Sequence, residues 1–367
     1  MRGVRGAMAL AGMAGVAAMA WMGAATAADA PAVVDQNGHR VVLPAQVRRV
    51  AVIPIPLASM VMAVDGGAQR LAAMHTASRA DFDYGLLGRL FPDAARIPAQ
   101  IAGEGFVPNV EALAASGADV VIQWGDRGDD IVRPIRELGL PVVTVRYGDS
   151  SLAAGWLRLV GASLGKPARG ERLAQWFESR RADVAARTAP IAAAERPRVL
   201  YLQRARSGLR AAGKGTSMDG DIRLAGGVNV AAGVPGFAQV SVEQLLAWDP
   251  QVVLLNNFEP GLVPADLYGD ARLRGLAAVR ERRVYSYPHG GFRWDPPSQE
   301  TPLTLDWLSS LFHPQRAEPG IRDRIADAYR LLYDYRMTPR DTDDLLKLDA
   351  NGASAYYRAL FGQGAAP

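Results

Sequence analysis

The sequence predicts an α/β protein with two Rossmann-like lobes, each built on a sheet of the parallel type, joined by a long rigid backbone helix. Short apolar runs alternate with amphipathic helical stretches, which is typical of parallel sheets. A helix–strand unit occurs twice, as "FVPNVEALAASGADVVI" at 106–122 and "AQVSVEQLLAWDPQVVL" at 238–254. Between the two copies lies a helical segment without a strand candidate. The expected parts are therefore an N-terminal lobe at 28–151, the connector at 152–188, a C-terminal lobe at 189–320 and a helical tail at 321–367.

The strands are predicted from short apolar runs that end at proline, glycine or polar residues. They lie at 48–54, 70–75 and 119–124 in the first half, and at 197–203, 251–256 and 282–288 in the second. The repeated helices are expected at 109–116 and 241–247.

The connector has helical spacing of apolar residues with charges on the other side. Gly165-Lys166-Pro167 interrupts it and should break or kink the helix. About 30 helical residues would span roughly 45 Å, which suits a rod between two lobes. Such a rod allows slight rocking and resists wide opening.

The N-terminus predicts a secretory signal peptide over residues 1–27. Arg2 and Arg5 precede a run of small apolar residues that closes on Ala25-Thr26-Ala27, an A-x-A cleavage pattern. An uncleaved membrane anchor is the alternative, because the run approaches the length of a bilayer span. The sequence has no cysteine, which excludes a lipid-anchored cysteine, a disulfide framework and a thiolate metal site. We therefore expect a periplasmic protein that is not lipid-anchored.

Composition and motifs argue against several classes of function. The net charge is +4, and acidic residues are interspersed among the basic ones, so no nucleic-acid groove is indicated. The sequence has no G-x-S-x-G, complete P-loop or H-E-x-x-H pattern, and we expect no enzyme. An exported hydrolase or lyase on a two-lobed scaffold remains the alternative from another class.

The mature sequence resembles the helical-backbone, or class III, periplasmic substrate-binding proteins, which deliver cobalamin and iron–siderophore complexes to ABC importers. The resemblance rests on "DQNGHRVVLP" followed by "RRV" near the start, on "WDPPSQETPLTLDWL" near the end, and on the order of elements between them. It implies a monomeric binding protein that works with an inner-membrane permease dimer and its cytoplasmic ATPase. It implies no intrinsic cofactor.

Glu111 and Glu243 occupy the same position of the repeat, in the first turn of its helix. The resemblance implies that the two carboxylates dock onto arginines of the permease pair. A glutamate in a first turn also stabilises its helix through the dipole, which is the alternative explanation.

A ligand is expected between the lobes, at the carboxyl ends of the strands. The loops expected there are rich in arginine and aromatic residues, and the candidate ligand-binding residues are Arg79, Tyr84, Trp124, Arg127, Arg204, Arg206, Arg210, His289, Arg293 and Trp294. Each also has a structural explanation: Trp124 could be a core residue, Trp294 could cap its proline-rich turn, and the arginines could be solvated.

Arginine and aromatic side chains suit an anionic complex with flat or apolar arms. A ferric siderophore is therefore the expected ligand, with cobalamin, haem, a nickel chelate and molybdate as alternatives. The four histidines form no ligand motif, so no protein-held metal is expected. A sensor protein without a transporter is a further alternative.

The helical tail at 321–367 should pack on a lobe through Tyr329, Leu332, Tyr333 and Leu345.

Overall fold

The computed structural model describes residues 30–362, and the expected signal peptide lies outside them. Residues 31–362 belong to one compact unit, which contains both lobes. Within residues 30–362, every helix is too short or too polar to cross a bilayer.

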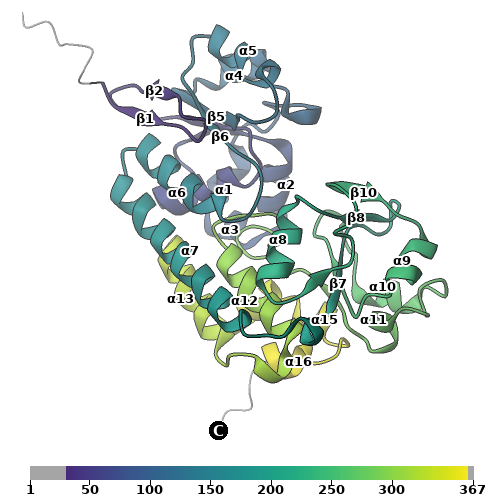
Figure 1. The fold of residues 1–367 in the computed structure, drawn as a ribbon. Coiled ribbons are helices and arrows are strands. Elements are labelled where there is room, and N and C mark those ends of the chain that lie inside the picture. The colour runs from purple at the N-terminus through teal and green to yellow at the C-terminus, as the bar shows by residue number, and fades with distance from the viewer. Residues whose placement is uncertain (1–29, 363–367) are drawn as a thin grey trace, which may run out of the picture. The chain divides into compact units, whose positions relative to one another are not determined.

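The N-terminal lobe holds a four-stranded sheet in the order β4-β3-β5-β6. Figure 1 labels β5 and β6 of this sheet. All neighbouring strands are parallel. Their residues are buried throughout, because helices cover both faces of such a sheet and only apolar runs fit there. The strands are β3 (Val50–Val52), β4 (Leu71–Met74), β5 (Val120–Trp124) and β6 (Val142–Val145). The helices are α1 (Leu57–Asp65), α2 (Thr76–Tyr84), α3 (Leu86–Leu90), α4 (Val110–Ser116) and α5 (Arg133–Glu137).

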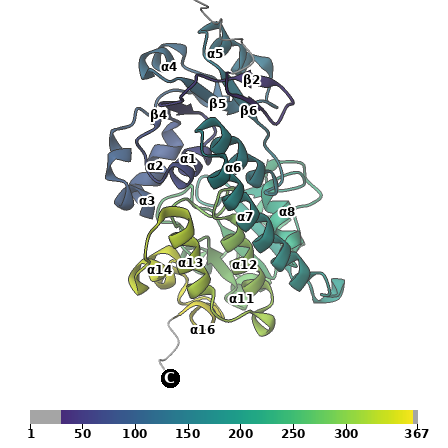
Figure 2. The ribbon, with the colours of Figure 1, turned by 90° about the vertical axis from the view of Figure 1, so that its left-hand side faces the viewer.

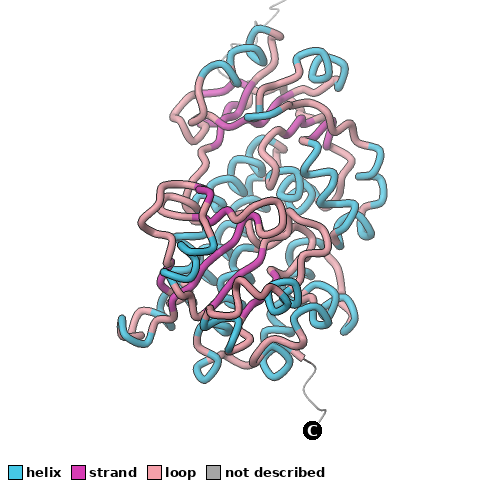
Figure 3. Tube along the Cα trace, turned by 90° about the vertical axis from the view of Figure 1, so that its right-hand side faces the viewer, coloured by secondary structure: helices cyan, strands magenta, loops and turns pink. Residues whose placement is uncertain are grey.

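The C-terminal lobe holds a six-stranded sheet in the order β10-β8-β7-β11-β12, with β9 also paired to β7. Figure 3 shows the strands of both lobes in magenta. The pairs of β7 with β9 and β11, and of β11 with β12, are parallel. Strands β8 and β10 add an antiparallel extension, which the sequence pattern did not predict. The strands are β7 (Arg198–Arg204), β8 (Arg210–Ala212), β9 (Val228–Asn229), β10 (Phe237–Gln239), β11 (Val252–Leu255) and β12 (Val284–Ser286). The helices are α8 (Ser217–Leu224), α9 (Val242–Trp248), α10 (Pro264–Gly269), α11 (Ala277–Arg280) and α12 (Thr301–Phe312).

The connector is a pair of packed helices, α6 (Leu152–Ser163) and α7 (Pro167–Thr188) (Figure 2). The chain breaks at the predicted Gly165-Lys166-Pro167 segment, so the expected connector over 152–188 is two helices and not one continuous rod. Gly165 has φ +67° and Pro167 begins α7, so the chain turns between the helices. A Cβ atom on Gly161 would lie 2.7 Å from the Cα of Gly170, so only glycine allows this contact. The 22 residues of α7 alone span about 33 Å.

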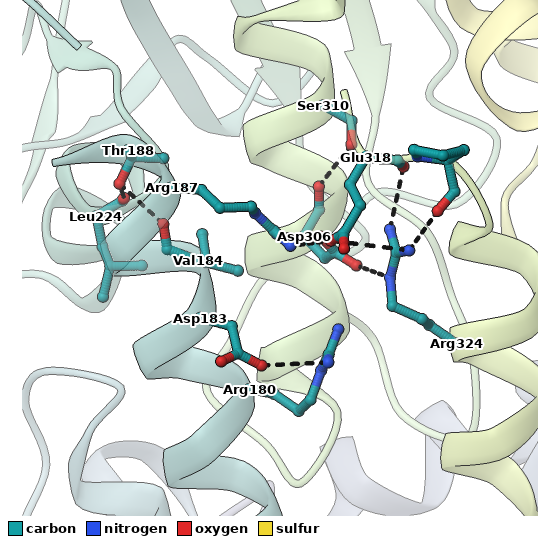
Figure 4. Close-up of polar contacts among 11 residues, drawn as sticks. Arg180, Asp183, Val184, Arg187, Thr188, Leu224, Asp306, Ser310, Glu318 and Arg324 are labelled. Carbon is teal, nitrogen blue, oxygen red and sulfur yellow. Dashed lines mark hydrogen bonds and ion pairs between the residues drawn. The ribbon is translucent and has the colours of Figure 1, made fainter. Parts of the chain in front are cut away.

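Helix α7 packs against α1 of the N-terminal lobe and against α8 and α12 of the C-terminal lobe. An ion cluster fixes its C-terminal half: Asp306 of α12 binds Arg187 of α7, at 2.5 Å, and also Arg324 (Figure 4). The hydroxyl of Thr188 donates to the carbonyl of Leu224 in α8, at 2.6 Å. The connector is thus held by both lobes.

The tail, α13 (Ile321–Tyr333), α14 (Pro339–Leu345), α15 (Leu348–Asn351) and α16 (Tyr357–Phe361), packs on α12 and also reaches α1. Its four expected anchors are all buried, which confirms them as packing residues. The hydroxyls of Tyr329 and Tyr333 donate to the buried carboxyl of Glu300, at 2.8 and 2.5 Å. Burial raises the pKa of Glu300.

At the other end of the described chain, β1 (Ala32–Val34) and β2 (Arg40–Val42) form an antiparallel β-hairpin.

Candidate functional site

A cavity of about 610 Å³ lies where the carboxyl ends of both sheets face each other. Each lobe contributes loops that follow its parallel strands, the place where open α/β sheets bind ligands. The aromatic side chains that line it are Phe106, Trp124, Tyr147, Trp156, Tyr201, Phe237 and Phe258. Its polar side chains are Arg127, Gln203, Arg210, Ser217 and Asp295.

The N-terminal wall is an aromatic cluster centred on Trp124. The Trp124 ring is 2 % exposed and meets the rings of Tyr147 and Trp156 edge to face, with centroids 5.7 Å apart in both pairs. Its indole N–H has no hydrogen-bond partner among residues 30–362. Trp124 is therefore both a core residue and a cavity residue. Burial raises the pKa of the Tyr147 hydroxyl.

Arg127 covers this aromatic wall. Its guanidinium carbon lies 4.9 Å from the ring centroid of Phe106, 5.5 Å from that of Trp124 and 5.0 Å from that of Tyr147. Within residues 30–362 it forms no ion pair with a carboxylate. Contacts with three ring faces hold a cation in place by cation–π attraction and leave its charge available to a ligand.

The C-terminal wall carries Arg210 and Phe258. Arg210, on β8, lies over the ring of Phe237 at 5.9 Å and donates to the Phe237 carbonyl at 3.3 Å. Phe258 lies under two arginines: the guanidinium of Arg204 is 5.5 Å from its centroid and that of Arg293 is 4.5 Å away. Arg204 and Arg293 therefore border the cavity through Phe258 without lining it.

Arg293 and His289 form a buried ion cluster with Asp81 of α2. Asp81 Oδ1 lies 2.7 Å from Arg293 Nε and 3.0 Å from His289 Nε2, although the latter contact is not aligned as a hydrogen bond. Burial alone raises the pKa of Asp81, but the charges of His289 and Arg293 outweigh it and lower the pKa. The cluster joins α2 to the loop after β12, and His289 does not line the cavity.

The structure does not bring four other expected residues to the cavity. Arg79 donates to the carbonyls of Ala94 and Ile97, because α2 turns it toward the following 3₁₀ segment. Tyr84 is 78 % exposed at the end of α2. Arg206 points outward and pairs with Asp266 at 2.8 Å. Trp294 is buried and donates to Glu300 at 2.8 Å, which agrees with its structural explanation.

Several cavity residues were not predicted. Tyr147 follows β6, and the rule that ligands meet the ends of parallel strands could have found it. Asp295 stands beside Trp294 in the quoted "WDPP" segment. Phe237 lies on the antiparallel extension, for which a parallel-sheet pattern gives no signal. Residues 30–362 contain no cluster of three or more histidine or acidic residues that could hold a metal ion.

Glu111 and Glu243 are exposed and each is the second residue of its helix, α4 or α9. Each helix is capped one residue earlier: Asn109 accepts from the amide of Ala112 at 3.0 Å, and Ser241 accepts from that of Gln244 at 3.2 Å. The pKa of the Glu243 carboxyl is lowered by hydrogen bonds from the Glu243 backbone N–H and from the Ser241 hydroxyl.

Comparison with known proteins supports the resemblance to periplasmic substrate-binding proteins. The family model described as "Periplasmic binding protein" matches residues 101–289. A periplasmic solute binding protein from Veillonella parvula superposes with a TM-score of 0.80 at 30 % identity, over 88 % of this chain and 98 % of that one.

The molybdate-binding protein MolA of Haemophilus influenzae is 25 % identical over 325 residues, which cover 81 % of this chain and 89 % of that protein. The molybdate-bound structure of MolA superposes with a TM-score of 0.73 at 22 % identity, over 84 % of this chain and 99 % of that one. These relatives are substrate-binding proteins and not enzymes, and their family places the chain in the periplasm. The chain belongs to the periplasmic binding protein family, in the class III group of solute-binding proteins that serve ABC importers.

Proposed function

We propose that the protein captures an anionic metal chelate, most favourably a ferric siderophore, in the cavity between its lobes and delivers it to an ABC permease. The observation that carries the proposal is Arg127, which lies over three aromatic rings of the cavity wall without a carboxylate partner among residues 30–362. Aromatic faces accept the flat arms of a chelate, while guanidinium groups bind carboxylate or catecholate oxygens.

The size and lining of the cavity support an organic complex. A volume of about 610 Å³ is typical of sites for drug-sized ligands. Apolar rings line both walls, and Arg127 and Arg210 offer positive charge from opposite lobes. Such a site suits an anionic chelate better than it suits cobalamin, which is close to neutral. Haem and a nickel chelate also carry flat or anionic parts and remain alternatives.

Molybdate is the second candidate, because the MolA relative is a molybdate-binding protein. A bare oxyanion would use the arginines and leave most of the aromatic surface without a partner. The identity to MolA is too low for the ligand to be transferred by resemblance alone.

We further propose that Glu111 and Glu243 bind the permease. Both carboxylates are exposed and occupy equivalent helix positions in the two lobes, as expected for contact with two equivalent permease subunits. Complementary charge at such a surface sets register and association rate. A sensor without a transporter would not need this pair.

Titration of intrinsic tryptophan fluorescence tests the ligand, because Trp124 and Trp156 line the cavity. Ferric catecholate, hydroxamate and carboxylate siderophores are compared with cobalamin, haem, a nickel–histidine complex and molybdate. We expect saturable quenching by an anionic ferric complex, weakened in Arg127→Ala and unchanged in Arg206→Ala, whose side chain lies outside the cavity. Quenching by molybdate or cobalamin alone would overturn the proposed ligand.

A further inference from the structure

Two acceptor atoms next to the cavity have no hydrogen-bond partner among residues 30–362. Asp295 is 1 % exposed, and its Oδ2 accepts from the Tyr201 hydroxyl at 2.9 Å and from the Asn257 amide at 3.0 Å. Its Oδ1 accepts from no group in the described part of the chain. The side-chain oxygen of Gln203, on β7, is likewise buried without a partner there. Both residues line the cavity from the C-terminal lobe.

Nearby cations do not satisfy the free oxygen of Asp295. The charge of Asp295 acts on the half-buried Lys347, but the Lys347 ammonium group donates to the side chain of Asn257. Arg204 donates to the Gln203 carbonyl at 2.7 Å. The carboxylate is thus held in place by Tyr201 and Asn257 while one of its oxygens stays unpaired.

A ligand satisfies an unpaired buried acceptor with an N–H or O–H group or, where the acceptor is a carboxylate, with a cation. Both residues line the cavity, but protein atoms cover both oxygens in this structure, so each side chain has to turn its free oxygen toward the cavity to meet a ligand. Arg127 on the opposite wall and Arg210 on the same lobe line the cavity too, and arginines bind acceptors. The cavity therefore offers groups that recognise oxygen anions and groups that recognise hydrogen-bond donors.

We infer that the cargo carries an amide or hydroxyl donor, which binds Asp295 and Gln203, in addition to the anionic groups that bind the arginines. This inference rests on the proposed function and narrows it to chelates with a donor-bearing organic frame. The oxygens of molybdate act as acceptors, so a bare oxyanion would leave both side chains unsatisfied. Asp295 and Gln203 are then specificity-determining residues.

Two iron complexes of equal charge test the inference. Ferric tris(catecholate) has three catechol rings and no N–H, whereas a ferric tris(catecholamide) has the same metal core with amide donors. We expect the wild-type protein to bind the amide complex about ten-fold more tightly, which is the size of one hydrogen bond to a charged group. In Asp295→Asn this advantage should disappear, because an amide NH₂ replaces the free oxygen.

Gln203→Met serves as a second variant, because the Gln203 side chain holds no other element in place among residues 30–362 and its replacement should leave the melting temperature unchanged. We expect it to reduce the advantage about three-fold. Equal binding of the two complexes by wild type, or the same change for both complexes in each variant, would overturn this inference alone. Failure of wild type to bind either complex would contradict the proposed function and this inference together.

Discussion

The two lobes share one framework and differ at the cavity. Strand order β4-β3-β5-β6 in the N-terminal lobe corresponds to β9-β7-β11-β12 in the C-terminal lobe. The register agrees as well, since Val50 pairs with Val120 in the first sheet and Val199 with Val252 in the second. Helices α4 and α9 precede the equivalent strands β5 and β11. The repeat seen in the sequence is therefore a repeat of structure.

The ends of the repeated helices are fixed in the same way. Arg49 donates to the carbonyl of Gly117 at 3.0 Å, and Arg198 donates to that of Asp249 at 2.8 Å. Both caps have left-handed φ, +63° and +38°. In each lobe an arginine at the start of a central strand, Arg49 just before β3 and Arg198 as the first residue of β7, thus satisfies a carbonyl at the end of the repeated helix.

The cavity walls have no such correspondence. The N-terminal strand β5 ends on Trp124, whereas the equivalent position after β11 is Asn256, which donates to the Leu202 carbonyl at 3.1 Å. The C-terminal lobe adds β8 and β10, which carry Arg210 and Phe237 into the wall. The proposed docking residues therefore keep the symmetry of the repeat, while the residues that line the cavity do not.

Charge reversal at Glu111 and Glu243 tests the part of the molecule that is symmetric between the lobes. Of the changes proposed here, it should have the largest effect, and the quantity affected is ligand uptake. We expect Glu111→Lys and Glu243→Lys each to lower ligand uptake by reconstituted permease about ten-fold, and the double variant about 100-fold, because like charges then face each other. Ligand affinity should not change. Glu281→Lys, after α11 at the amino end of β12, is the control. An effect of only one glutamate would show that the lobes do not dock equivalently.

The contact between Ser150 and Asp221, which joins the start of the connector to the C-terminal lobe, should make the free energy of unfolding depend on pH. Asp221 of α8 is buried and accepts from Ser150, which precedes α6, at 2.5 Å. Burial raises its pKa to about 7, opposed by the Ser150 hydrogen bond and by Arg181 and assisted by Asp149. The folded state therefore holds a proton that the unfolded state releases near pH 4, and its contribution to stability falls as the pH rises toward 7.

Asp221→Asn cannot ionise and keeps an acceptor for Ser150. Between pH 5 and pH 8 we expect wild type to lose on the order of 2 kcal/mol of unfolding free energy relative to this variant. Urea unfolding at several pH values measures the difference. Parallel pH profiles of the two proteins would contradict the assignment.

The ligand walls should respond unequally to loss of their arginines. Arg127 contacts three rings and Arg210 one, so we expect Arg127→Ala to weaken binding of a ferric catecholate about ten-fold and Arg210→Ala about three-fold. Fluorescence titration gives both dissociation constants, and Arg206→Ala serves as the unaffected reference. Equal losses would mean that the two walls contribute alike despite their different construction.

The smallest effect is expected at the helix caps. Gly117→Ala places a Cβ atom at φ +63° and should cost about 1 kcal/mol of stability. Asp249→Gly relieves a similar strain but loses the hydrogen bond from the Ala277 amide, so its net effect should stay within about 0.5 kcal/mol. Urea unfolding of both variants compares the caps. A larger loss in the C-terminal lobe would mean that the Asp249 side chain outweighs its backbone strain.

The framework could be predicted because it depends on local patterns. Apolar runs, helix periodicity and the repeat gave both lobes and the positions of Glu111 and Glu243, since each signal lies within one short segment. The cavity required knowledge of distant contacts. Arg79 and Arg206 follow strands as Arg127 does, but they do not reach the cavity. Arg79 donates to nearby backbone carbonyls, and Arg206 pairs with Asp266.

The connector shows the same limit. Its helical content and its break at Gly165 were correctly predicted, but periodicity does not tell whether a broken helix continues or turns back. The contact between Gly161 and Gly170, nine positions apart in the chain, decided that it turns.

That glycine contact has a consequence for how a transporter distinguishes loaded from empty carriers. No side chain separates α6 from α7 at this contact, and Arg187 pairs the far end of α7 with Asp306. We expect a connector held by both lobes to keep the distance between the two proposed docking carboxylates, Glu111 and Glu243, nearly constant whether or not cargo is present. We expect the importer to sense the cargo surface itself at the mouth of the cavity, and not a change in the distance between Glu111 and Glu243.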